Sequence, residues 1–323
     1  MSQKVLFPQF CPQVLKDLLL DMGYESVDGT GISEEDIIAD IQRTGCEAIV
    51  ARTAEYTPRI MEAAKGQVKI IARYGVGLDA IDLKAAEKAG IWVSFTPLAN
   101  ASTVAEHTVG LMIASAHNMS YCMSETRKGN FGCRNEFTGQ DVMGKTVGIA
   151  GFGKIGSIVG KICHFGLGMK VLAYDPYLPD EKVPEWAEKV SWEKLFQESD
   201  FVCCHMPLVE STRGIVGKKE FEMMKPSGIF LNAARGGVVD ESALIEALRK
   251  KEIAAAGLDV TASEPIEPDN PLLTMPNVNI TPHMASFTKE CYDRMARHTA
   301  QCIQDVLTGH EPSWPANKVK KGM

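Results

Sequence analysis

The chain has 323 residues, of which 45% are hydrophobic and 23% are charged, and its formal net charge is -7 at pH 7. This composition is ordinary for a globular protein and excludes a chain that is mainly collagen, coiled coil or intrinsically disordered. The negative charge argues against a surface that binds nucleic acid or anionic membranes. Since no apolar run approaches the roughly 18 residues of a membrane span and the N-terminus does not resemble a signal peptide, we expect a cytoplasmic protein with neither nucleic-acid nor membrane partners.

Short apolar runs alternate with helical patterns along most of the chain. Several runs are apolar throughout, which is typical of strands buried on both faces of a parallel sheet. The predicted strands are residues 5–7, 48–51, 68–72, 91–94, 146–150, 170–174, 201–204, 229–232, 256–260 and 278–280. The predicted helices include residues 33–43, 83–88, 103–116, 155–165, 242–250 and 289–306. This alternation predicts a doubly wound α/β architecture.

Two proline-containing segments, residues 96–100 and 281–286, each lie between a predicted strand and a helix and are typical of joints. A glycine-rich motif begins only at residue 146, after a first α/β pattern, and little beyond one helix follows residue 286. We therefore predict a cofactor domain, residues 99–286, inserted into a substrate domain formed by residues 1–98 and 287–323. The cleft between them is expected to hold substrate and cofactor.

The strongest local motif is TVGIAGFGKIG at residues 146–156. It contains G-x-G-x-x-G, in which Gly151 permits a tight turn, Gly153 lets the backbone approach a pyrophosphate, and Gly156 lets helix and strand pack closely. The helix that follows, with Lys154 and Ile155 in its first turn, presents free N–H groups and a positive dipole end to phosphates. The motif therefore predicts a dinucleotide site.

Asp175 ends the next predicted strand, 19 positions after Gly156. A carboxylate here accepts hydrogen bonds from the ribose hydroxyls and repels a 2′-phosphate. The following Pro176 and Tyr177 supply no cation to replace it. The sequence therefore predicts NAD rather than NADP; the alternative is a structural strand-turn-helix with a solvated aspartate.

Three polar residues, Arg235, Glu264 and His283, each follow an apolar strand, and ligands of open parallel sheets bind at the carboxyl ends of strands. Arginine binds a carboxylate through two parallel hydrogen bonds, histidine exchanges a proton near neutral pH, and a glutamate beside it stabilises the imidazolium. With NAD, this set predicts oxidation of a 2-hydroxy acid or reduction of a 2-keto acid. Each residue alone also has an ordinary structural explanation. The other histidines are interpreted as structural or solvated: His107, His117, His164, His205, His298 and His310.

These segments together resemble the D-isomer-specific 2-hydroxyacid dehydrogenases over nearly the whole chain. The resemblance implies a Rossmann-type NAD-binding domain inserted into a flavodoxin-like substrate domain. The matching segments are RYGVGLDAIDL (73–83), ASTVAEHTVGLM (101–112), GFGKIG (151–156), CHMPLVESTRGIVG (204–217), MKPSGIFLNAARGGVVDESAL (224–244), AGLDVTASEP (256–265) and NITPHMAS (279–286).

The resemblance also implies roles for individual residues. His283 is the acid/base paired with Glu264, and Arg235 holds the substrate carboxylate. Asp259 is expected to hold the nicotinamide carboxamide. The remaining candidates are a turn facing the substrate carboxylate, formed by Tyr74, Gly75, Val76 and Gly77, and three cofactor-lining residues, Thr103, Pro207 and Thr212.

Within the family the chain is most similar to phosphoglycerate dehydrogenases, through residues 50–53, 73–77 and 100–102. In that subgroup an arginine placed like Arg52 meets the substrate phosphate, and Arg134 is a second candidate; the alternative for Arg52 is a salt bridge near the first strands. The resemblance leads us to expect a short form of such an enzyme, without the regulatory domain that many of them carry. Departures at 92–97 and after His283 leave open a hydroxypyruvate or glyoxylate reductase, and a NAD-dependent corepressor-like scaffold is a third possibility.

The predicted helix 103–116 is apolar on more than one face and corresponds to a dimer interface in the family, so we expect a homodimer. The alternative is a helix buried within one subunit. The 9 cysteines form no C-x-x-C pair and are interpreted as reduced, mostly buried thiols. Because cysteines and histidines do not cluster at ligand spacing, no metal site is predicted.

Overall fold

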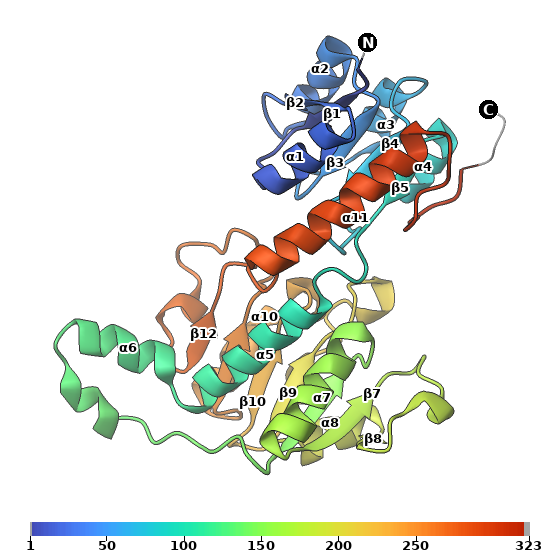
Figure 1. The fold of residues 1–323 in the computed structure, drawn as a ribbon. Coiled ribbons are helices and arrows are strands. Elements are labelled where there is room, and N and C mark those ends of the chain that lie inside the picture. Colours follow the sequence, from blue (N-terminus) through green and yellow to red (C-terminus); the bar gives the residue numbers. More distant parts are fainter. Residues whose placement is uncertain (1, 320–323) are drawn as a thin grey trace. The chain divides into compact units, whose positions relative to one another are not determined.

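The computed structural model describes residues 2–319 (Figure 1). The chain divides into two compact units, Met1–Asn100 together with Phe287–Met323, and Ala101–Ser286. Each unit is built on its own parallel β-sheet. Two parallel-sheet α/β domains confirm the predicted fold class.

The first unit contains a five-stranded sheet in the order β2-β1-β3-β4-β5, which is the flavodoxin-like order. Its strands are β1 (Lys4–Phe7), β2 (Glu25–Asp28), β3 (Ala48–Ala51), β4 (Ile70–Arg73) and β5 (Trp92–Ser94). Its helices are α1 (Gln13–Asp21), α2 (Glu34–Thr44), α3 (Pro58–Ala64), α4 (Leu83–Ala89) and α11 (Lys289–Leu307).

Alternate residues of the first sheet are buried in two different cores. Val5 and Val50 pack with the residues of α1 and α11, whereas Leu6 and Ile49 pack with those of α2, α3 and α4. Successive strand side chains point to opposite faces, so an uninterrupted apolar strand stabilises both layers at once. Each fully buried aliphatic side chain contributes about 1.5–3 kcal/mol.

The second unit contains a seven-stranded sheet in the order β12-β11-β10-β9-β6-β7-β8, a Rossmann-type arrangement with one added edge strand. Its strands are β6 (Thr146–Ala150), β7 (Lys170–Tyr174), β8 (Ala187–Lys189), β9 (Phe201–Cys204), β10 (Ile229–Asn232), β11 (Ala255–Leu258) and β12 (Val278–Ile280). Its helices are α5 (Ala101–Ala116), α6 (Met119–Arg127), α7 (Lys154–Leu167), α8 (Trp192–Glu198), α9 (Lys218–Met223) and α10 (Glu241–Lys250). Short 3-10 helices are η1 (Phe131–Asn135), η2 (Asp180–Lys182), η3 (Glu210–Thr212), η4 (Gly236–Val238) and η5 (Pro271–Thr274).

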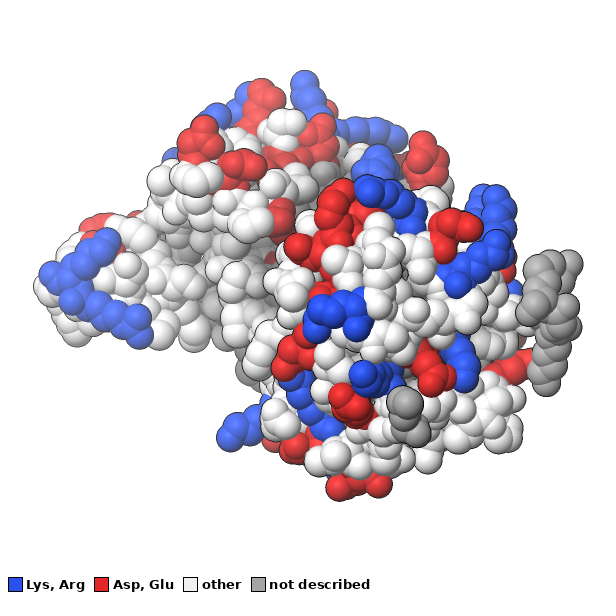
Figure 2. Space-filling view, turned by 90° about the horizontal axis from the view of Figure 1, so that it is seen from above, with Lys and Arg blue, Asp and Glu red and all other residues white. Residues whose placement is uncertain are grey.

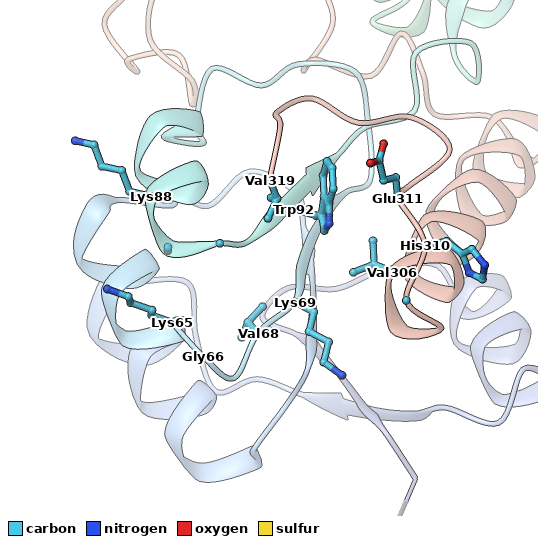
Figure 3. Close-up of a pocket in the computed structure, with 13 residues that line it drawn as sticks. Lys65, Gly66, Val68, Lys69, Lys88, Trp92, Val306, His310, Glu311 and Val319 are labelled. Carbon is cyan, nitrogen blue, oxygen red and sulfur yellow. The ribbon is translucent and has the colours of Figure 1, made fainter. Parts of the chain in front are cut away.

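A cavity of about 520 Å³ lies in the first unit, beside the amino-terminal ends of β4 and β5 (Figure 3). Lys65, the C-cap of α3, and Lys88, in the last turn of α4, line it. Their positive charges complement the negative ends of the two helix dipoles, which gives them a structural role. The carboxyl ends of the strands are at the opposite end of the sheet from this cavity. None of the predicted site residues lines the cavity.

The described residues contain no helix that is both long enough and apolar enough to cross a bilayer. On the face shown in Figure 2, basic and acidic side chains are interspersed. No group of three or more histidine, cysteine or acidic side chains in residues 2–319 is placed to hold a metal ion.

Candidate active site

The turn between β6 and α7 requires glycine at two positions. Gly151 has φ +93°, and a Cβ there would lie 2.8 Å from the carbonyl carbon of His205. A Cβ on Gly156 would overlap the carbonyl oxygen of Gly151. Gly153, the N-cap of α7, has open space where its Cβ would be and provides no side-chain cap. The N–H groups of Lys154 and Ile155 therefore lie at a helix N-terminus that a pyrophosphate can approach.

Asp175 follows β7 and is held beside this turn. Its Oδ2 accepts a hydrogen bond from the backbone N–H of Phe152 at 3.1 Å, and its Oδ1 accepts one from Tyr177 at 2.9 Å. Both bonds fix the carboxylate next to the glycine turn. This arrangement fits the ribose hydroxyls of NAD and disfavours a 2′-phosphate.

Two other cofactor candidates are in contact with each other after β9. The hydroxyl of Thr212 donates to the carbonyl oxygen of Pro207 at 2.6 Å and accepts from the backbone N–H of Val209 at 2.9 Å. His205 lies at the end of the same strand, where burial lowers its pKa to about 4 and keeps the imidazole neutral. Thr103 is nearly buried in the first turn of α5.

The catalytic candidates lie on three loops that follow neighbouring strands. Arg235 follows β10, Glu264 follows β11 and His283 follows β12. The first two loops touch so closely that a Cβ on Gly236 would overlap the carbonyl oxygen of Thr261. Sheet order thus gathers residues that are far apart in the sequence.

His283 and Glu264 contact each other directly. The imidazole Nδ1 lies 2.6 Å from Oε2 of the carboxylate. The His283 side chain is 50% exposed and that of Glu264 is 40% exposed, so the pair is accessible to a ligand. Arg235 is half-buried on the adjacent loop, and its Nη1 donates to the carbonyl oxygen of Ala234 at 2.7 Å.

Asp259, a predicted cofactor ligand, is buried at the end of β11 and holds the loop that carries His283. Its Oδ1 accepts from the backbone N–H of Met284 at 2.8 Å, and its Oδ2 accepts from Ala285 at 2.9 Å. Burial raises the pKa of this carboxyl, but hydrogen bonds from His107, Thr281, Met284 and Ala285 outweigh burial, and the net pKa is lowered. The carboxylate is therefore charged and engaged in the protein.

The substrate-binding candidates of the first unit lie at the carboxyl ends of β3 and β4. The guanidinium of Arg52 is 5.9 Å from the centroid of the Tyr74 ring, and its Nη1 donates to the carbonyl oxygen of Phe10 at 2.8 Å. The hydroxyl of Tyr74 donates to the carbonyl oxygen of Tyr292 at 2.8 Å. Arg52 is therefore held by a backbone hydrogen bond and by contact with an aromatic ring.

Arg73, which was not among the predicted site residues, shapes the turn formed by Tyr74, Gly75, Val76 and Gly77. Arg73 donates through Nε to the carbonyl oxygen of Gly77 at 2.7 Å and through Nη1 to that of Arg52. Gly75 has φ +147°, a conformation that favours glycine. Arg73 thus connects the two substrate-binding candidates of the first unit.

Arg134 lies outside the group of catalytic loops. It is exposed on η1, where its guanidinium is 5.4 Å from the centroid of the Phe131 ring. The segment η1 packs against α6. On η1 the guanidinium of Arg134 is thus in contact with an aromatic ring of the same segment.

Comparison with known proteins identifies the family. Residues 109–285 match the family described as "D-isomer specific 2-hydroxyacid dehydrogenase, NAD binding domain". The chain belongs to this family. The match confirms the predicted family, and it confirms NAD as the cofactor of the domain built around the glycine turn.

Relatives of the same family extend the similarity to nearly the whole chain. D-3-phosphoglycerate dehydrogenase of Archaeoglobus fulgidus is 39% identical over 308 residues, covering 95% of this chain and 58% of the relative. A crystal structure of a Thermus thermophilus protein is 32% identical with a TM-score of 0.88, covering 97% of this chain and all of that one. D-lactate dehydrogenase of Lactobacillus jensenii, solved with NAD+, is 28% identical with a TM-score of 0.79, covering 98% and 100%. The chain spans about half the length of the curated relatives it matches.

Proposed function

We propose that this chain is an NAD-dependent enzyme that interconverts a D-2-hydroxy acid and its 2-keto acid. The observation that supports it most is the 2.6 Å contact between His283 Nδ1 and Glu264 Oε2, at the carboxyl edge of a sheet that also carries the glycine turn of an NAD-binding domain. The family match supports the same reaction. So does Arg235, which by resemblance to the family is the residue that holds the substrate carboxylate.

The proposed mechanism assigns one task to each side chain. Bound NAD supplies the hydride acceptor in oxidation and, when reduced, the donor in reduction. Because Nδ1 of His283 faces Glu264, Nε2 is the atom that exchanges a proton with the substrate oxygen. Glu264 stabilises the imidazolium that this exchange forms. Arg235 binds the substrate carboxylate and orients C2.

For cofactor binding, we propose that the glycine turn with Lys154 and Ile155 receives the pyrophosphate and that Asp175 binds the ribose hydroxyls. Thr103, Pro207 and Thr212 contribute to the same site. For Asp259, the engagement of both carboxylate oxygens by Thr281, Met284 and Ala285 supports a second role, which is to hold the His283 loop.

We further propose 3-phosphoglycerate as a substrate, on the basis of the similarity to phosphoglycerate dehydrogenase and of Arg52. An assay of NADH oxidation with 3-phosphohydroxypyruvate, hydroxypyruvate, glyoxylate and pyruvate tests both proposals. Preference for the phosphorylated acid supports the substrate, and preference for hydroxypyruvate or glyoxylate identifies the reductase. NADH binding without turnover of any 2-keto acid would instead indicate a binding scaffold.

Replacing Arg52 by alanine is expected to lower kcat/KM for 3-phosphohydroxypyruvate by about 10–100-fold, since each hydrogen bond to a charged group is worth about 1.5–3 kcal/mol. The value for hydroxypyruvate, which lacks the phosphate, is expected to change little. The ratio of the two constants in wild type and variant measures the effect. Arg59→Ala, which removes an exposed arginine paired with Glu34 and Glu35, is the matched control. An equal loss for both substrates would show that Arg52 acts only through its bond to Phe10.

We also propose that the chain forms a homodimer and acts in the cytoplasm. Helix α5 is largely buried within its own unit, which is the alternative considered for it. As the interface we propose the apolar side chains exposed on α6 and η1, where Met123 is 56% and Phe131 is 70% exposed. We propose that the second copy of the chain packs against this surface and that Arg134, which lies on η1, contacts that copy. The cysteines of the described residues are free thiols, which fits a reducing compartment.

Met123→Asp is expected to shift the protein from twice the mass of the chain to a single copy, because a charge placed in an apolar interface is left unpaired. Light scattering at several concentrations measures the mass. Leu20→Asp, at an exposed leucine of α1 in the first unit, is the control and is expected to leave the mass unchanged. A wild-type mass equal to one chain would contradict the dimer.

A further inference from the structure

His107, which the sequence alone presented as a structural or solvated histidine, contacts the loop of the proposed acid/base. It lies on α5, one turn after Thr103, and its side chain is 21% exposed. Its Nε2 is 3.0 Å from the hydroxyl oxygen of Thr281 and 3.4 Å from Oδ1 of Asp259. His107 therefore reaches the end of β12 from a different layer of the unit.

The direction of these hydrogen bonds follows from the chemistry of the groups. The Thr281 hydroxyl is 2.6 Å from Oδ1 of Asp259, and a charged carboxylate only accepts, so the hydroxyl proton points to Asp259. The Thr281 oxygen is left as an acceptor toward His107. Nε2 of His107 therefore carries a proton and donates it.

The hydrogen bonds that join His107, Thr281 and Asp259, here called the relay, continue into the backbone around His283. The carboxylate accepts from the backbone N–H groups of Met284 and Ala285, and the carbonyl oxygen of Asp259 accepts from the N–H of His283 at 2.8 Å. His283 has φ +50°, in the left-handed region, which is unfavourable for a non-glycine residue. A loop that holds an unfavourable conformation needs restraint from its surroundings.

We propose that His107 and Thr281 are positioning residues that fix the orientation of His283 through Asp259. The inference rests on the proposed function, in which His283 exchanges the proton. Neither residue is assigned a contact with substrate. Their task is to keep the imidazole within the narrow range of positions that proton transfer requires.

A second hydrogen bond between α5 and β12 offers a matched control. Nδ2 of Asn279 donates to the Ser115 hydroxyl at 3.0 Å, and both residues are buried. This bond joins the same helix to the same strand but does not lead to the His283 loop. Ser115→Ala therefore removes a comparable helix–strand contact without touching the relay.

The variants Thr281→Val and His107→Ala are expected to lower kcat by about tenfold, because small misplacements of a reacting group cost up to roughly 100-fold. KM for NADH is expected to change less than about twofold in the same variants, since positioning acts on the proton step. His107→Gln, whose side-chain amide donates from a similar position, and Thr281→Ser are expected to recover most of kcat. Ser115→Ala is expected to keep it. The double variant His107→Ala/Thr281→Val is expected to lose no more kcat than either single variant, because the effects of substitutions within one relay do not add.

A spectroscopic readout keeps the test independent of turnover. The His283 imidazole signals in NMR spectra of the full chain, assigned by comparison with His283→Ala, are expected to shift in the relay variants and to stay in place in Ser115→Ala. If the wild type reduces 2-keto acids with NADH but Thr281→Val and His107→Ala keep full kcat and unchanged His283 signals, the positioning role is wrong and the proposed function stands. If the wild type shows no turnover, the proposed function fails, and the NMR shifts alone decide whether His107 positions His283.

Discussion

Replacing His283 by alanine or glutamine is expected to lower kcat by about 10²–10⁴, the range typical of general acid–base catalysis. The expectation follows from the contact between Nδ1 and Glu264, which leaves Nε2 for the substrate. The dissociation constant of NADH is expected to change little, because the glycine turn and Asp175 lie on other loops of the same sheet. Steady-state kinetics and NADH fluorescence titration measure the two quantities.

A matched control for this experiment is His117→Ala, which removes an exposed histidine just after α5. Its kcat is expected to equal that of the wild type. Glu264→Gln adds a second comparison, because it keeps a hydrogen-bond acceptor beside Nδ1 and removes the charge that stabilises the imidazolium. A His283 variant with near wild-type turnover would assign the proton transfer to another group.

The interior strands were predictable because their burial dictates their composition. The interior strands β3, β6, β7, β9 and β10 have the bounds expected from the sequence, and so does β12 at the edge of its sheet; β3, β9 and β10 are buried throughout. The edge strands β2 and β8 were missed, since Glu25–Asp28 and Ala187–Lys189 contain no fully buried residue and carry charged side chains. A short polar strand has no apolar run to identify it.

Helix α6 is not among the helices expected from the sequence. No residue of this helix is buried, so the apolar periodicity that marks a packed helix is weak. Helices α2 and α10 were easier to recognise, since each has an apolar face and an N-cap, Ser33 or Asp240, whose side chain accepts a backbone hydrogen bond.

In the candidate site, the sequence predicted which residues follow neighbouring strands but not what holds them. Arg235, Glu264 and His283 were recognisable because a charged residue after an apolar strand is visible in the sequence. The relay through His107 and Thr281 was not, because it joins a helix to a strand end 174 positions away and no local pattern marks it. Positioning contacts of this kind depend on tertiary packing, which a single sequence does not reveal.

Arg235→Gln is expected to lower kcat/KM for 2-keto acids by about 10²–10⁴, since two hydrogen bonds to a charged group are each worth about 1.5–3 kcal/mol. Arg235→Lys keeps the charge but loses the planar fork, so its loss is expected to be smaller. The loop itself is expected to persist in both variants, because the buried Asn232 side chain donates to the carbonyl oxygen of residue 235 at 3.0 Å and accepts from Ala234 at 3.0 Å.

The decisive comparison for Arg235 uses a substrate without a carboxylate. With glyoxal, an aldehyde that offers a carbonyl but no acid group, wild type and Arg235→Gln are expected to have similar kcat/KM values, because the interaction that the variant removes does not exist. Arg249→Lys, at an exposed arginine in the last turn of α10, is the control for Arg235→Lys, because it makes the same side-chain change away from the site. An equal loss with the acid and with glyoxal would mean that Arg235 supports the loop or the cofactor rather than the carboxylate. A loss confined to the acid assigns Arg235 to carboxylate binding, because only that contact separates the two substrates.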